Sequence, residues 1–247
     1  MSRNTLFVAG LALILAIGAL VLPFVLPSDT GGEAVDLSGI RADITQLKQA
    51  SSSQSMRIAY MDAEAAFLVF VTAVSDLRQQ ITDKNNEIAE LNQERTQGLV
   101  SDADYQRRLY VLQAELLDAR ITTAAGTLKR MIASDEFADL RSALVTLSDQ
   151  GQPLVDAINE LVSTILVGAI DAGEFQQRLA AYTQAFNEFD GYVTSAATTK
   201  LVQATDMVAN EYGYDLVVRK KDVIMYRNPA TIDDITDLVK AEITGYL

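Results

Sequence analysis

The feature that most constrains the fold is a long span of helical periodicity, from Asp62 to Tyr212, in which Pro153 is the one proline. Short segments with the character of β-strands stand at its two ends. One of them, Arg57–Asp62, precedes the span. The other two, Tyr214–Arg219 and Val223–Arg227, follow it and are predicted to form a hairpin. The whole chain of 247 residues holds 4 Pro and 13 Gly. Pro and Gly interrupt helices and strands, so a chain with few of them typically consists of a few long secondary-structure elements. We therefore predict a mainly α fold with a small β body.

Apolar residues recur every seven positions in the first half of the span, with a second set interleaved between them. The sets are Phe67, Val74, Ile81 and Ile88, and Phe70, Leu77 and Leu91, with Lys84 as the one interruption. A narrow stripe with this spacing is typical of a coiled coil. Gly98 then ends one helix, and Ser101 with Asp104 forms a capping-box variant at the start of the next. We therefore predict that residues 63–133 form an antiparallel helical arm of roughly 50 Å.

Residues 134–212 repeat this design at a constant offset of 70 positions. The matched pairs are Gly98 and Gly168, Ser101 and Asp171, Tyr105 and Phe175, and Arg108 and Arg178. Both matched stretches have the signals of a helix-hairpin tip, so residues 134–212 are expected to form a second helical arm. Two unrelated caps would also explain the match, because similarity outside the tips is slight.

The outward helix of the second arm has an apolar face too wide for a two-helix seam. Its members are Leu154, Val155, Ile158, Leu161, Val162, Ile165 and Leu166. Such a face either packs against a further partner or forms a binding surface. We take Ile158, Leu161, Ile165 and Leu166 as candidate binding residues. Tyr105 and Phe175 are two further candidates at the tips, where each aromatic ring either contacts a bound partner or packs on its own hairpin.

The N-terminal part carries an uncharged apolar run, Leu6–Leu26, of 21 residues. That length is enough for a helix that crosses a bilayer, and we expect an anchor in residues 1–28 that includes Leu6, Leu13, Val21 and Leu26. Arg3 precedes the run, so the positive-inside rule places the N-terminus in the cytoplasm and the rest outside the inner membrane. A cleaved signal peptide is the alternative. Residues 29–55 are expected to form a short juxtamembrane coiled coil and a Ser-rich linker.

Composition removes several classes of function. The chain has no Cys and no His, which are the usual ligands of transition metals and the usual groups of thiolate or imidazole catalysis. Its net charge of -13 disfavours a nucleic-acid partner, because binding to phosphates needs clustered Lys and Arg. Acidic groups such as Glu87, Glu90 and Glu94 are best explained as caps and solvated helix faces. We therefore expect no enzyme, no cofactor and no metal site.

Two regions of the sequence resemble the Skp/OmpH family of periplasmic chaperones. The first is Arg57–Asp62, followed by the helix of Phe67. The second has the order and spacing of the family's C-terminal half. It comprises Lys200–Gln203, Val208–Val218, Val223–Pro229 and Asp234–Val239. Close similarity covers about a third of the chain. The remainder resembles the family only in its coiled-coil pattern.

The resemblance implies a homotrimer whose small β-sheet or barrel is assembled from all three chains, with coiled-coil arms that surround a cavity for unfolded outer-membrane proteins. In this chain the body would comprise residues 56–62 and 213–247. Its strand residues would be Ile58, Tyr60, Leu216, Val218, Val223 and Met225. This sequence departs from the family in its expected anchor, its second arm and its acidic arms. From Asp62 to Glu211 we count 11 basic and 23 acidic residues, so binding of acidic clients does not transfer.

Two functions are consistent with these features. The first is an ATP-independent holdase, tethered to the inner membrane, that shelters unfolded exported polypeptides between its arms. The second is a trimeric coiled-coil scaffold that holds one specific envelope protein or bridges envelope layers. The first needs many weak contacts with varied clients, whereas the second needs one stoichiometric partner.

Overall fold

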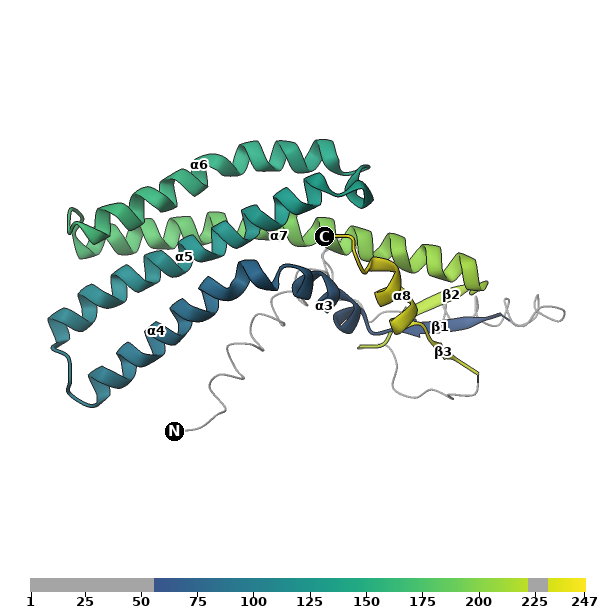
Figure 1. Ribbon diagram of the computed structural model, residues 1–247, viewed down its shortest axis with the longest axis horizontal. Helices are drawn as coiled ribbons and strands as arrows, with labels where there is room; N and C mark the ends of the chain where they lie inside the picture. Colours follow the sequence, from purple (N-terminus) through teal and green to yellow (C-terminus); the bar gives the residue numbers. More distant parts are fainter. Residues whose placement is uncertain (1–55, 222–230) are drawn as a thin grey trace, which may run out of the picture. The chain divides into compact units, whose positions relative to one another are not determined.

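The structure is a computed structural model that describes residues 56–221 and 231–247, and Met56–Leu247 forms one compact unit (Figure 1). It is mainly helical with a small sheet, as the sequence predicts. The expected anchor residues Leu6, Leu13, Val21 and Leu26, the segment 29–55, and Val223 and Met225 of the expected hairpin lie outside the described residues. Across the two described ranges, no helix combines the length and the apolar character needed to cross a bilayer.

The described strands form one parallel sheet. Strand β1 (Ile58–Met61) lies between β2 (Leu216–Arg219) and β3 (Asp233–Asp234). The register pairs Ile58 with Leu216 and Tyr60 with Val218. The short strand β3 is absent from the sequence prediction. Its second residue, Asp234, accepts a hydrogen bond from the Thr236 N–H (3.0 Å), just before α8 (Thr236–Ile243).

The first predicted helix is broken near Val74. It consists of α3 (Ala63–Ala73), a 3-10 turn (Ser75–Arg78) and α4 (Gln79–Thr96). Side chains from the next helix satisfy carbonyl groups at the break. Arg130 donates to the Ala73 carbonyl (2.7 Å), and the Thr123 hydroxyl donates to the Leu77 carbonyl (2.8 Å). The break allows α3 to pack on α7 and α8 beside the sheet, while α4 pairs with α5.

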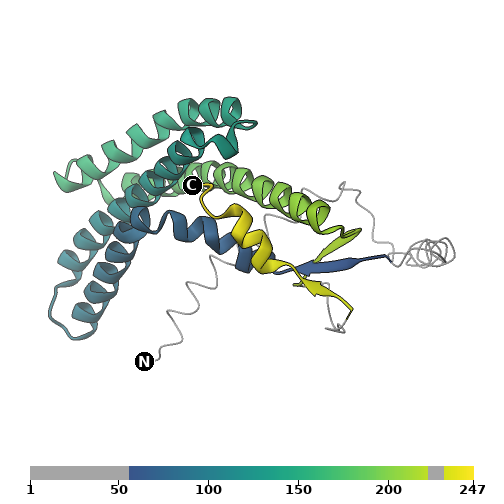
Figure 2. The same cartoon turned by 45° about the vertical axis from the view of Figure 1, so that its right-hand side comes forward.

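Three long helices complete the unit: α5 (Asp102–Ala133), α6 (Arg141–Leu166) and α7 (Ala172–Tyr212). Helix α5 contacts α4, α6 and α7, so the two helical hairpins pack against each other. The α4–α5 and α6–α7 turns lie at the same end, away from the sheet (Figures 1 and 2). Helix α7 runs from that end to the sheet (Figure 2).

The largest core cluster joins the sheet to these helices. Ala59 and Met61 of β1 meet Phe70 of α3 and Ile235 and Val239 near α8. The same cluster continues along α5, α6 and α7 through side chains that alternate at helical spacing. They include Ile121, Leu128, Leu144, Ile158, Phe189, Val193 and Leu201. The hairpins and the sheet therefore share one core.

Candidate functional site

The turn between α4 and α5 is a tight, capped helix-hairpin tip. Gly98 has a φ of +72°, in the left-handed region where glycine is the favoured residue. The Leu99 N–H donates to the Glu94 carbonyl (2.9 Å), which closes the end of α4. The Ser101 hydroxyl accepts from the Asp104 N–H (3.1 Å) at the start of α5. The predicted glycine end and serine cap are confirmed.

The turn between α6 and α7 has the same local structure. Gly168 has a φ of +67°, and the Ala169 N–H donates to the Thr164 carbonyl (3.0 Å). The Asp171 carboxylate accepts from the Glu174 N–H (2.9 Å). The two tips are thus equivalent in backbone geometry, which agrees with the repeat in the sequence.

A groove of about 910 Å³ lies between the two tips. One part of its lining is apolar and comes from α5 and the second tip, namely Tyr110, Val111, Leu112, Ile165, Leu166, Val167 and Ile170. Leu166 is 58% exposed and Val167 is 78% exposed. Large apolar side chains in contact with water at the mouth of a groove are a typical feature of a binding surface.

The groove lining also includes charged side chains, and most of these charges are paired within the first hairpin. Lys84 Nζ lies 3.0 Å from a Glu87 oxygen and 2.9 Å from a Glu115 oxygen. Burial lowers the pKa of Lys84, but hydrogen bonds to Glu115 and Glu87 outweigh it and leave the pKa raised. Arg108 pairs with Glu94 (2.5 Å). Lys84, which interrupts the heptad stripe, therefore links α4 to α5 by its ion pair with Glu115.

Tyr105 packs on its own hairpin, which resolves one of the two alternatives for this ring. It is 7% exposed, and its hydroxyl donates to Asn92 Oδ1 (2.7 Å). The Arg95 guanidinium carbon lies 4.3 Å from the centre of the Tyr105 ring. The tyrosine is therefore a structural part of the first tip.

Phe175 is also buried within the chain. It is fully buried, and its ring centre lies 4.9 Å from that of Tyr110. Phe175, Ala114, Leu161 and Ile165 form one core cluster between α5, α6 and α7. The second tip thus uses its aromatic residue to join the two hairpins.

Of the two alternatives for the apolar face of α6, the structure shows packing against further helices, and three of the four client-binding candidates on this helix are buried. Ile158 and Leu161 are fully buried and Ile165 is 9% exposed. The sequence indicates that this face is too wide for one partner. In the structure α6 packs on two helices, α5 and α7. Of the client-binding candidates on α6, only Leu166 remains exposed.

The four described residues of the expected trimer body share one face of the sheet. Residues at alternate positions of a strand point to the same face, and paired residues of parallel neighbours do so too. Ile58 and Tyr60 of β1 therefore lie on the same face as Leu216 and Val218 of β2. The other face, with Ala59, Met61 and Val217, packs on the helical core. Leu216 is 43% exposed, and Tyr60 is fully buried with its hydroxyl 2.5 Å from Asp234.

Sequence reasoning missed two tip residues, Leu99 and Val167. Leu99 is 72% exposed and Val167 is 78% exposed. Each lies directly beside the left-handed glycine of its tip, so the glycine that marks a hairpin tip is the sequence signal that could have identified it. Within the described ranges, no three acidic residues come close enough to hold a metal ion. With paired charges and exposed aliphatic groups, the groove between the tips is suited to binding.

Comparison of the chain with models of protein families, with curated proteins and with solved structures finds no match.

Proposed function

We propose that the protein is an ATP-independent holdase that binds unfolded exported polypeptides in the groove between its hairpin tips. The observation that carries this proposal is the exposure of Leu166 and Val167 beside a groove whose charges are largely paired. Such a surface favours apolar segments of a client without demanding a specific charge. The Leu6–Leu26 run would tether the chaperone to the inner membrane, with the hairpins outside the cytoplasm.

The contact is expected to be weak at each groove. Full burial of a Val or Leu side chain stabilises a complex by about 1.5 to 3 kcal/mol. Two partly exposed side chains can therefore supply roughly 2 to 4 kcal/mol, which corresponds to a Kd between about 1 and 30 mM. A weak contact of this kind lets a client leave when folding or insertion offers more stabilisation.

Assembly into a homotrimer would combine three such grooves. The sheet supports this part of the proposal, because Ile58, Leu216 and Val218 lie together on the face away from the helical core. Contacts of one client with several grooves raise the overall affinity without any new type of contact. Analytical ultracentrifugation of the full chain is the test, and a folded monomer at micromolar concentration would contradict the shared body.

The groove is tested by a double substitution, Leu166→Ser with Val167→Ser. Both side chains are exposed, so we expect the fold to be retained and the suppression of aggregation of a urea-unfolded outer-membrane protein to weaken. The matched control carries Leu68→Ser and Val145→Ser, which remove exposed apolar side chains of α3 and α6 outside the groove lining. Equal protection by the groove variant, the control and the parent would show that the groove does not bind clients.

A further inference from the structure

The outer side of α7 carries a regular exposed stripe. Its members are Glu188, Tyr192, Ser195, Thr199, Val202 and Asp206, and all six are exposed. Their spacing alternates between four and three residues, the heptad spacing at which one helix packs on another. Tyr192 is 65% exposed and Val202 is 55% exposed. The buried side of the same helix, with Phe189, Val193 and Leu201, already belongs to the core.

The middle of the stripe is small and weakly polar. The Ser195 hydroxyl donates to the Gly191 carbonyl (2.8 Å), and the Thr199 hydroxyl donates to the Ser195 carbonyl (3.0 Å). Because both hydroxyls donate within their own helix, neither needs water or a partner as an acceptor. A second helix can therefore approach α7 between Tyr192 and Val202 at little cost in lost hydrogen bonds.

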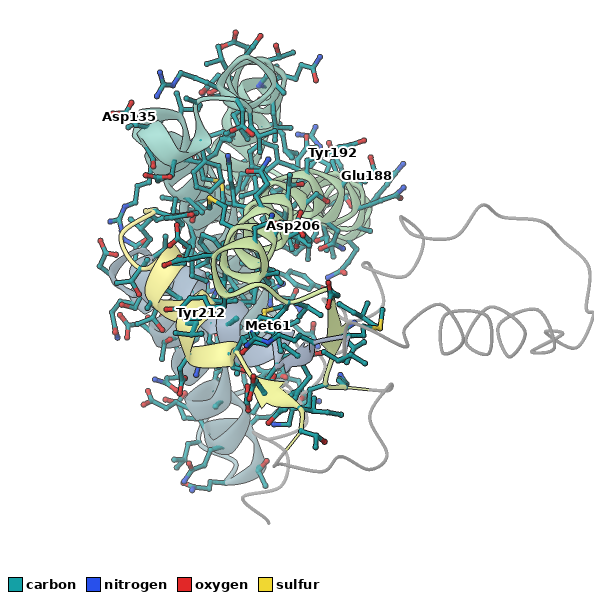
Figure 3. All side chains as sticks on the ribbon, turned by 90° about the vertical axis from the view of Figure 1, so that its right-hand side faces the viewer. Met61, Asp135, Glu188, Tyr192, Asp206 and Tyr212 are labelled. Atoms are coloured by element: carbon teal, nitrogen blue, oxygen red, sulfur yellow. The ribbon has the colours of Figure 1, made fainter. Side chains whose placement is uncertain are left out.

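Both ends of the stripe carry carboxylates. Glu188 and Tyr192 project from the side of α7 that faces away from Asp135, and Asp206 lies further along the helix (Figure 3). In α7, which the structure describes in full, Lys200 is the one cation after Arg178. Lys200 is 5% exposed and bonds to Asp139 and Gln203. The stripe therefore has a small, weakly polar middle between Tyr192 and Val202, and it is anionic at its ends.

We propose that the α7 stripe docks a cationic amphipathic helix of a partner protein. The two carboxylates are 18 positions apart in α7, a span of roughly 27 Å. The fitting partner is therefore a helix of about five turns with Lys or Arg at both ends and small apolar residues between them. This surface is separate from the groove between the tips and does not depend on the holdase function.

A second copy of the same stripe does not fit. Antiparallel pairing would place Glu188 of one chain near Asp206 of the other, and parallel pairing would place like residues together. Both arrangements bring carboxylates together, which is unfavourable. An anionic lipid surface is repelled for the same reason. Charge complementarity thus selects a cationic protein segment.

The test uses the full chain and two fluorescent helical peptides, with binding followed by anisotropy. Both peptides have Leu and Ala at heptad positions. One has Lys and Arg at its two ends, and its twin has Glu at the same places. We expect the cationic peptide to bind at least about tenfold more tightly than its twin, and to bind more weakly as the salt concentration rises.

Two variants locate the site. Tyr192→Ser with Val202→Ser removes the apolar contacts, and Glu188→Lys with Asp206→Lys reverses the charges. We expect each pair to weaken the cationic peptide at least about tenfold, whereas the control pair on α6, Val145→Ser with Asp149→Lys, leaves its affinity unchanged. Equal binding of both peptides, or unchanged affinity in both variants, would overturn the proposal. A lower sedimentation mass of the Tyr192→Ser and Val202→Ser variant would also overturn it, because the stripe would then join copies of this chain.

Discussion

Gly151 lies within α6 against the ring of Phe189 on α7, and it offers a sharp test of how the two hairpins pack. A Cβ added at Gly151 would lie 2.4 Å from Cε2 and 3.0 Å from Cδ2 of that ring. An ordinary carbon contact needs about 3.5 to 4 Å, so α6 or the ring must move by roughly 1 Å. Phe189 is 6% exposed and packed in the core, which leaves little free space for the movement.

Gly151→Ala is therefore expected to destabilise the fold. Overpacking of a core costs about 1 to 3 kcal/mol, and the better helix propensity of Ala offsets up to about 1 kcal/mol of this. The expected net loss is about 1 kcal/mol. Gly126→Ala in α5 is the matched control. Its nearest atom is Cδ1 of Leu77 at 3.0 Å, the end of a flexible side chain, so propensity prevails and the variant gains roughly 0.5 to 1 kcal/mol.

The two variants should therefore differ by about 2 kcal/mol. Thermal unfolding of the full chain by circular dichroism should show this as a difference in Tm of about 4 to 8 °C, with Gly151→Ala the lower. Phe189→Leu should reduce the loss caused by Gly151→Ala in a double-mutant cycle, because it removes the clashing ring edge. Equal or higher stability of Gly151→Ala relative to Gly126→Ala would refute the packing of α6 on Phe189.

Three further predictions concern single side chains. Leu161→Ala should lower the free energy of unfolding by about 2 to 5 kcal/mol in urea denaturation, because Leu161 is fully buried; a loss of client capture at unchanged stability would contradict its place in the core. Asp171→Ala should cost about 1 kcal/mol through loss of the α7 cap, and Asp171→Asn should retain most of that stability. Burial, Glu242 and Glu136 raise the pKa of Tyr246 to about 12, so its contribution is full below pH 10 and falls as pH rises towards 12. Tyr246→Phe should flatten the unfolding free energy over that range, and an unchanged slope would contradict the raised pKa.

Local signals in the sequence were sufficient for the two hairpin tips and for the helix ends that form them. Gly98, Gly168, Ser101 and Asp171 act within a few residues of themselves, since a left-handed backbone and a cap hydrogen bond need no distant partner. The offset of 70 positions likewise predicted two hairpins with equivalent tips. Strand β1 could also be predicted from the sequence, because its short apolar segment stands apart from the helical pattern.

What covers each apolar surface was decided only by tertiary structure. The width of the α6 face indicated a need for more than one neighbour, but not that α5 and α7 supply both and bury Leu161. The break at Val74 depends on Arg130 and Thr123, which lie about 50 residues later in the sequence. The groove between the tips exists because the two hairpins lie side by side, with Leu166 and Val167 left in contact with water. Periodicity records which side of a helix is apolar, whereas burial depends on contacts between residues that are far apart in the chain.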